Sequence, residues 1–250
     1  MKPASDLAWP QGFVVYDDRD LMARETVIEL MTFRIRREFT ELNRAIRFFQ
    51  IETPMLTPLA ALKGHEETGF ELVDAHFKKH GAQSMYLRPE TTFGTYAAFR
   101  AMWPIEAERK KQMPICLWQF GKSFRDEQAR PMSELRFREF YQLEYQLFFS
   151  PDTKADYFAA ACRATTQAVG SVAGEDQWEV SYVDPKELAH YSLRTADIYV
   201  RTSESEPRGP EDIKKHEVAA ISERKDFDAN TKVIEISVGL DRLTALQRLV

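Results

Sequence analysis

Cysteine is scarce in this sequence, and its scarcity excludes two kinds of structure. Cys116 and Cys162 are the only cysteines among 250 residues. They lie far apart and form no CxxC pair, so the sequence has neither the spacing of a zinc site nor a disulfide framework. A protein without a disulfide framework is typical of a reducing compartment, and we therefore predict a cytoplasmic protein. Cys116 lies in an apolar, strand-like segment, so we expect it to pack in the core rather than to act as a nucleophile.

Long hydrophobic runs are also absent. No apolar run approaches the roughly 18–20 residues that a membrane span needs, and the N-terminus does not combine a basic stretch with an apolar one. We therefore expect no membrane span. With 44% hydrophobic and 29% charged residues, the chain has the composition of a folded globular protein. A chain of this length buries roughly 70–75% of its unfolded surface, and we predict a single domain over residues 1–250.

An excess of positive charge is missing as well. The formal net charge is −5, from 34 Lys and Arg against 39 Asp and Glu. The chain as a whole therefore offers no general attraction to a polyanion, and any nucleic acid would need a local basic surface. Basic clusters occur at 34–37, 109–111 and 214–215, although a solvated helix face is the simpler explanation of each.

The pattern of apolar residues predicts an α+β fold. Apolar residues recur at helical spacing over 20–48, and Pro54 and Pro58 confine the strand-like segment that follows to an edge or an end of a sheet. Because the strands come in runs separated by single helices, the sheet is expected to be mostly antiparallel. Further helices are predicted at 91–112, at 153–173 and after Gly239, strands at 84–88, 114–121, 135–149, 177–184, 195–202 and 231–239, and a loop at 203–213.

Ionisable residues are densest in the strand-like segment 119–149. Two strands joined by a polar turn are expected to form a hairpin there, with guanidinium and carboxylate groups over one surface. Arginine suits phosphate oxygens because its planar fork binds them bidentately, and an aromatic ring can stack on a base. A surface hairpin laced with ion pairs is the plainer alternative. The candidates are Arg125, Glu127, Arg136, Arg138, Phe140 and Glu144.

Three further segments carry the same kinds of group and weaken the plainer alternative. One of them turns at Gly239 and presents Arg242 in the first turn of a helix. A helix start is a favourable place to meet a phosphate because unpaired backbone N–H groups point there. The candidates are Arg88 and Glu90 in 86–94, Arg224 in 221–228, and Glu235, Ser237 and Arg242 in 233–246.

These four segments, in this order, resemble the signature of class II aminoacyl-tRNA synthetases, and more closely that of glycyl-tRNA synthetases. GKSFRDE with the returning REF resembles the second motif of the class, VGLDRL its third, and IETPMLTP its first, the dimer-forming motif. The phrases LKGHEETGF, YLRPETTFG, ELAHYSLRTADI and EVAAISERKDFD resemble glycyl-tRNA synthetases in particular. The resemblance covers nearly the whole chain from about residue 20.

The resemblance implies a mostly antiparallel sheet of six or seven strands flanked by helices. On such a sheet ATP binds bent, and the carboxylate of glycine attacks the α-phosphate to give glycyl-adenylate and pyrophosphate. ATP and Mg²⁺ are the implied cofactors, glycine the substrate, a tRNA acceptor end the acceptor, and a homodimer the assembly. This chemistry requires positioning and charge neutralisation rather than a covalent nucleophile.

The resemblance also implies roles for individual residues. Arg125 would hold the α-phosphate, Glu127 and Phe140 the adenine end, and Arg242 the γ-phosphate, with Arg136 assisting. The amino-acid-binding positions would be Glu90, Glu144, Arg224, Glu235 and Ser237. Carboxylates there attract the ammonium group, and Arg224 either binds the substrate carboxylate or braces the acids. The resemblance assigns no residue to the metal and no role to His190 or Tyr191.

Two departures from the family pattern bear on the substrate. Gln146 stands where the family usually has a second acid and Ile236 where it has proline, so another small amino acid stays open as substrate. No anticodon-binding domain is expected after the third motif. Three interpretations therefore stay open: a minimal tRNA-charging enzyme, a stand-alone ligase that passes glycine or another small amino acid to a carrier protein, small molecule or modified nucleic acid, and a catalytically inactive accessory protein.

Overall fold

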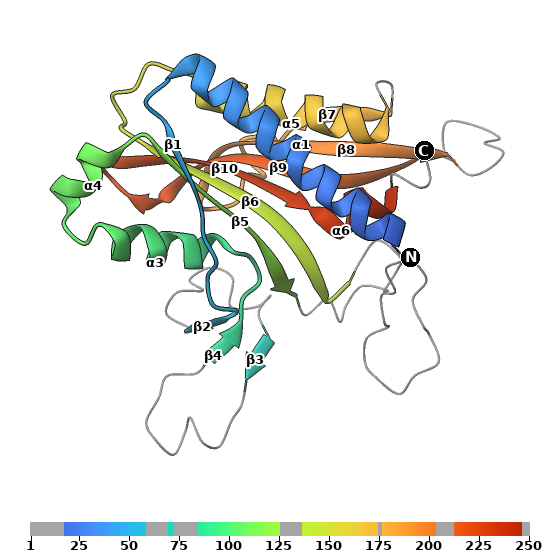
Figure 1. Cartoon of the computed structure of the whole chain (residues 1–250), viewed down its shortest axis with the longest axis horizontal. Helices are drawn as coiled ribbons and strands as arrows, with labels where there is room; N and C mark the ends of the chain where they lie inside the picture. The colour runs from blue at the N-terminus through green and yellow to red at the C-terminus, as the bar shows by residue number, and fades with distance from the viewer. Residues whose placement is uncertain are drawn as a thin grey trace.

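A central sheet of seven strands dominates the computed structural model, which describes residues 18–58, 70–72, 85–125, 137–174, 177–203 and 213–246. Its strands are β1 (Arg47–Gln50), β5 (Ile115–Phe124), β6 (Glu139–Phe149), β7 (Trp178–Tyr182), β8 (Ser192–Ser203), β9 (Ile213–Asp228) and β10 (Thr231–Gly239). They lie in the order β1-β5-β6-β10-β9-β8-β7 (Figure 1). Within the described ranges, β1 pairs with β5 in parallel and the other neighbours are antiparallel. The predicted α+β fold is confirmed.

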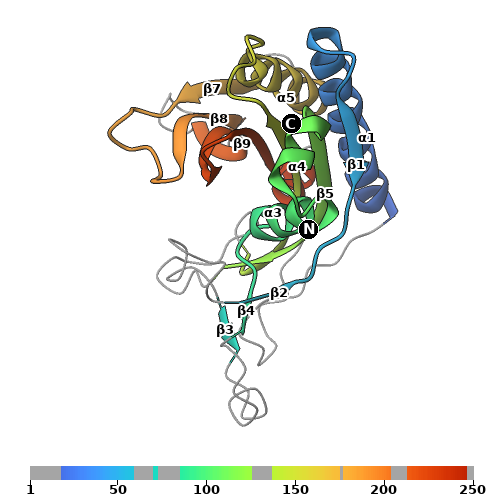
Figure 2. The same cartoon turned by 90° about the vertical axis from the view of Figure 1, so that its left-hand side faces the viewer.

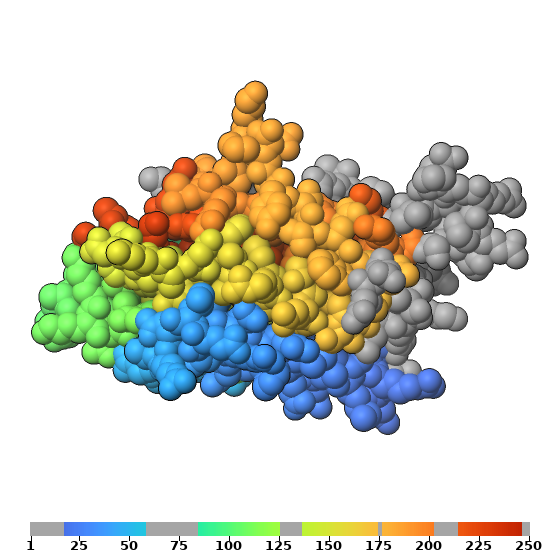
Figure 3. All heavy atoms as spheres, turned by 90° about the horizontal axis from the view of Figure 1, so that it is seen from above, coloured from blue at the N-terminus to red at the C-terminus, as the bar shows by residue number. Residues whose placement is uncertain are grey.

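Helices cover the two faces of this sheet unequally. α1 (Asp18–Leu42) and α5 (Tyr157–Ala173) lie side by side over one face, as Figures 1 and 3 show. α6 (Leu240–Leu246) follows β10 and buries its apolar residues in the same core. α3 (Thr92–Met102) packs on the other face at one end of the sheet, and α4 (Glu106–Gln112) follows it. The remainder of that second face carries polar side chains.

Alternation along the strands explains this division between a core face and a polar face. In β6, Leu143 and Tyr145 are buried in the core beneath α1 and α5, whereas Glu144 points to the opposite face. In β10, Ser237 is the register partner of Glu144 and shares its face, while Ile236 packs in the core. Neighbouring strands therefore bring polar residues together in one place.

Aromatic rings close the second face at its α3 end. The rings of Phe99 and Phe148 stack with their centroids 4.0 Å apart, and Phe227 packs against both. Aromatic pairs at such separations add to the stability that area burial supplies. This aromatic cluster fixes α3, together with the turn that precedes the helix, against the sheet.

A small three-stranded sheet projects from the main body beside α3 (Figures 1 and 2). Its strands are β2 (Leu56–Pro58), β3 (Phe70–Leu72) and β4 (Met85–Leu87), in the order β2-β4-β3. Buried Arg88 ties it to the main sheet by donating hydrogen bonds to the carbonyl oxygens of Lys122 and Thr53, each at 2.8 Å. A Cβ at position 121 would overlap the guanidinium of Arg88, so Gly121 permits this close approach.

The structure confirms most of the predicted elements and corrects several. The strand predicted at 231–239 has the bounds of β10. The proline-bearing segment forms β1 at the edge of the main sheet and then β2, which ends at Pro58, at an edge of the small sheet.

The helical pattern over 20–48 ends as a helix at Leu42, and Arg47 and Phe48 belong to β1. β3 was not predicted, and the loop predicted at 203–213 lies, except at its ends, outside the described residues. The single helix predicted at 91–112 is in fact two helices, because Pro104 disfavours helical geometry at the residue before it. Strand β9 was not predicted, since its many charged residues conceal the alternation of its buried positions. No helix among the described residues is long and apolar enough to cross a membrane.

Candidate active site

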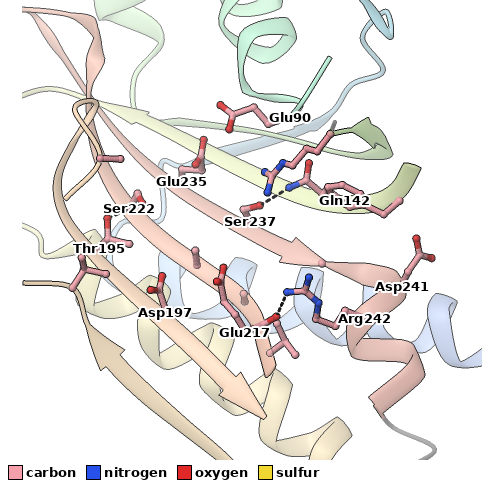
Figure 4. A pocket seen from close by; sticks show the side chains of 18 of the residues that line it. Glu90, Gln142, Thr195, Asp197, Glu217, Ser222, Glu235, Ser237, Asp241 and Arg242 are labelled. Carbon is pink, nitrogen blue, oxygen red and sulfur yellow. Dashed lines mark hydrogen bonds between the residues drawn. The ribbon is translucent and has the colours of Figure 1, made fainter. Parts of the chain in front are cut away.

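A pocket of about 380 Å³ opens on the polar face of the sheet. It lies over β6, β8, β9 and β10, and Figure 4 shows side chains from these strands converging on it. Six of the predicted site residues line it: Glu90, Arg125, Phe140, Glu235, Ser237 and Arg242. Two others, Glu144 and Arg224, are buried against residues that line it. Glu127 and Arg136 lie outside the described residues.

Arg224 on β9 joins the acids at one end of the pocket. Its Nη1 lies 2.8 Å from Glu235 Oε2 and 3.3 Å from Glu90 Oε1. Its Nε and Nη2 donate to the two carboxylate oxygens of Asp226 at 3.1 and 2.8 Å. Although burial acts against the charge, the carboxylates of Glu235 and Glu90 raise the pKa of Arg224 well above its ordinary value. Of the two roles considered for Arg224, the geometry favours bracing the acids.

A second layer of polar contacts links Glu144 with Glu235. Thr92 donates its hydroxyl to Glu235 Oε2 at 2.6 Å, and Gln146 Nε2 lies 3.1 Å from Glu144 Oε2 and 3.5 Å from Glu235 Oε2. Burial, together with the charges of Glu235 and Glu90, raises the pKa of Glu144 to about 7. Gln146 is an amide donor between two acids, so it avoids the extra repulsion that the family's usual acid would add here.

The acid cluster is therefore short of positive charge. Among the described residues, Glu90, Asp226 and Glu235 pair with one guanidinium, that of Arg224, while the charge of buried Arg88 acts on Glu144. A buried surplus of carboxylates is costly unless a cation compensates it. Two of these acids face the pocket, so a small ligand with an ammonium group would supply the missing charge.

Two arginines line the remainder of the pocket. Arg125 follows the last residue of β5, where its Nε donates to the carbonyl oxygen of Pro89 at 3.2 Å and its guanidinium lies 5.4 Å from the ring centroid of Phe140. Arg242 stands in the first turn of α6, and its Nη1 donates to the carbonyl oxygen of Glu217 at 2.5 Å (Figure 4). Guanidinium groups beside an aromatic ring suit a ligand that combines phosphates with a base.

Asp197 on β8 and Glu217 on β9 form a pair of carboxylates in the same pocket. Burial, together with the charge of Glu217, raises the pKa of Asp197 to about 6. Mg²⁺ is usually held by one or two carboxylates together with substrate phosphates, so this pair fits a cation that accompanies a nucleotide. No group of three or more metal-ligating side chains occurs in the described part of the chain.

Sequence reasoning missed many of the residues that line the pocket, and three polar ones illustrate why. Gln142, whose Nε2 donates to Ser237 Oγ at 3.2 Å, lies two residues before Glu144 in a predicted strand, so a shared face was inferable. Asp197 also falls in a predicted strand. Glu217 belongs to β9, which was not predicted, and its only signal was its place at the start of the phrase EVAAISERKDFD. Cys116 is fully buried and burial raises its pKa, so its expected place in the core is confirmed.

Known proteins resemble this chain in sequence. Residues 75–233 match the family described as the tRNA synthetase class II core domain (G, H, P, S and T). The glycine--tRNA ligase of Mesoplasma florum is 31% identical over 179 residues, which are 65% of this chain and 39% of that protein. That of Mycoplasmopsis synoviae is 31% identical over 175 residues, which are 64% of this chain and 38% of that protein. The match thus spans well under half the length of these relatives.

A solved structure has the same fold. Prolyl-tRNA synthetase of Giardia lamblia, in complex with prolyl-adenylate, superposes with a TM-score of 0.70 and covers 97% of this chain and 49% of that chain. The two sequences are 15% identical, so the likeness concerns the fold alone.

Proposed function

Because the chain belongs to the class II tRNA synthetase core family, we propose that it activates glycine with ATP and transfers the glycyl group to the acceptor end of a tRNA. The observation that carries this proposal is one pocket whose lining combines carboxylates with guanidinium groups. Glu90 and Glu235 line it beside the buried Arg224, and Arg125 and Arg242 line it as well. An amino acid and a triphosphate need such neighbours.

In the proposed reaction, the ammonium group of glycine lies against Glu90 and Glu235. Its carboxylate is thereby directed toward Arg125, which holds the α-phosphate. A carboxylate oxygen then forms a bond to the α-phosphorus, and the bond from that phosphorus to the bridging oxygen of pyrophosphate breaks. Arg125 and Arg242 stabilise the negative charge that shifts during this step.

Phe140 and the carboxylates of Asp197 and Glu217 complete the proposed ATP site. The ring of Phe140 stacks on the adenine, and the guanidinium of Arg125 stays fixed beside it. Asp197 and Glu217 would hold Mg²⁺, which would neutralise negative charge on the phosphates when it is bound. Ser237, hydrogen-bonded between Gln142 and Glu144, lines the amino-acid end.

Glycine-dependent exchange of labelled pyrophosphate into ATP tests the activation step. With Mg²⁺ present, we expect exchange with glycine and much weaker exchange with alanine and serine. Exchange with none of the standard amino acids would reject the enzymatic proposal and leave the inactive accessory protein. Exchange with another small amino acid in place of glycine would support the enzymatic proposal and change the proposed substrate. Gln146 and Ile236 leave this outcome open.

The acceptor requires its own experiment. Enzyme charged with labelled glycine is offered a glycine tRNA, an acceptor-stem minihelix and an RNA-free lysate fraction. Equal labelling of tRNA and minihelix supports recognition of the acceptor stem without the anticodon. Label that moves only into protein, a small molecule or DNA supports a stand-alone ligase in place of the tRNA-charging enzyme.

A further inference from the structure

Tyr191 lies in the pocket next to the acid cluster, immediately before β8 begins. The centroid of its ring is 4.0 Å from the guanidinium carbon of Arg224, within the range of a strong cation–π contact. The ring of Tyr96 lies 5.8 Å from the same carbon. The guanidinium that braces Glu90 and Glu235 thus has an aromatic face pressed against it from the pocket side.

Backbone hydrogen bonds hold Tyr191 in this place. Its carbonyl oxygen accepts from the amide of Lys225, the residue after Arg224, at 2.9 Å. The next amide, that of Ser192, donates to the carbonyl oxygen of Ala189 at 2.9 Å. The ring and the guanidinium it covers are therefore fixed through adjacent parts of the backbone. A wall that is fixed in this way can exclude a larger ligand by a clash, whereas a mobile side chain would yield.

We infer that Tyr191 determines the size of the amino acid that the pocket accepts, because its ring forms a rigid wall beside Glu90 and Glu235. The same ring holds the guanidinium of Arg224 in the orientation in which it binds both carboxylates. This inference rests on the proposed function and deepens it. An ammonium group held by the two glutamates brings the α-carbon of the substrate next to this wall. A hydrogen on that carbon is tolerated there, and a methyl group meets the ring.

The test compares glycine with alanine as substrates of Tyr191→Ala, Tyr191→Phe and His190→Ala in pyrophosphate exchange. Tyr191→Ala removes the wall, so the ratio of kcat/KM for glycine to that for alanine is expected to fall by roughly tenfold to a hundredfold. Tyr191→Phe keeps the ring and is expected to keep the ratio. His190 is exposed and does not line the pocket, and its ring packs edge-on against that of Tyr191 with the centroids 5.3 Å apart, so His190→Ala shows how much of a change comes from a disturbed loop rather than from the missing wall.

The outcomes separate this inference from the proposed function. If wild-type protein exchanges with glycine and the ratio is unchanged in a folded Tyr191→Ala, the inference is wrong and the proposed function stands. If wild-type protein exchanges with no amino acid, both are wrong. Should Tyr191→Ala fail to fold, Tyr191→Leu keeps an apolar side chain without an aromatic wall, and an unchanged ratio there overturns the inference equally.

Discussion

Nη1 of Arg224 lies 2.8 Å from Oε2 of Glu235, and both side chains are buried. Arg224→Leu removes the cation and leaves Glu235, Glu90 and Asp226 uncompensated. We expect a loss of about 3–5 kcal/mol in the free energy of unfolding, the range observed when one partner of a buried pair is removed. Urea denaturation measures it.

The matched control is Arg201→Leu, which removes an arginine from a partly exposed pair with Glu179, an acid that keeps Lys215 as a second partner. A change of at most about 1 kcal/mol is expected for such a surface pair. Equal losses in the two variants would contradict the central position given to Arg224.

Arg125 is expected to act mainly in the transition state. Arg125→Ala should reduce the rate of pyrophosphate exchange by roughly 10²–10³, because it removes one charge-assisted contact to the reacting phosphate. The control is Arg163→Ala, which alters an arginine on α5 that pairs with Glu38 on the opposite side of the sheet. A rate for Arg125→Ala near that of the control would show that the hairpin has been misassigned.

The raised pKa of Glu144 predicts a specific dependence of stability on pH. Burial and the charges of Glu235 and Glu90 raise this pKa from 4.5 to about 7, so between these values the folded protein holds a proton that the unfolded chain releases. The contribution of this carboxyl to stability is therefore complete at low pH and is lost as the pH rises through 7.

Glu144→Gln removes that dependence. Relative to wild type, the variant should gain unfolding free energy as the pH is raised from 5 to 8, measured by urea denaturation at several pH values. Glu108→Gln, which alters an exposed acid on α4, serves as the control. Parallel pH profiles for wild type and Glu144→Gln would refute the assignment of the raised pKa.

Asp197 and Glu217 should set the requirement for Mg²⁺. Asp197→Asn or Glu217→Gln is expected to raise the Mg²⁺ concentration for half-maximal exchange by roughly tenfold or more. Mutation of residues that only hydrogen-bond to a metal ligand already lowers metal affinity by about this factor. A titration of exchange against Mg²⁺ measures the shift. An unchanged Mg²⁺ requirement in both variants would show that other residues bind the metal.

The large apolar side chains exposed on α1 are expected to meet a second copy of the chain. Met22 and Phe33 are 68% and 59% exposed, and a symmetric dimer is the commonest way to cover such a face. Light scattering should give about twice 29.0 kDa for wild type and a lower mass for Phe33→Asp. Tyr182→Asp alters an equally exposed aromatic on β7 and should leave the mass unchanged. A wild-type monomer at micromolar concentration would end this expectation.

The sequence predicted those elements whose apolar residues follow a clear period. In β10, the core residues Ile234, Ile236 and Val238 alternate with Glu235 and Ser237, so the bounds of this strand and the shared face of Glu235 and Ser237 were inferable. β9 has the same alternation at Ala219 and Ile221, but its charged residues form partnerships with distant strands that no local pattern reveals.

The candidate site was predictable as a set of residues and not as an arrangement. Arg224 donates to Glu90, which lies 134 positions away in the sequence. Because of this separation, the sequence cannot show whether Arg224 binds the substrate carboxylate or braces the acids. Asp197 and Glu217 become neighbours only through the pairing of β8 with β9, so their joint fit to Mg²⁺ could not be seen before the fold was known.

β6 places Leu143, Tyr145 and Leu147 in the core and Gln142, Glu144 and Gln146 on the polar face. A change in chain length within this strand would therefore exchange the two sets, because a shift of one residue turns every side chain to the other face. Three polar groups would enter the contact with α1 and α5, and apolar groups would fill the pocket. Substitutions in β6 can be separated into effects on stability and effects on activity, but a single-residue insertion or deletion there would abolish both at once.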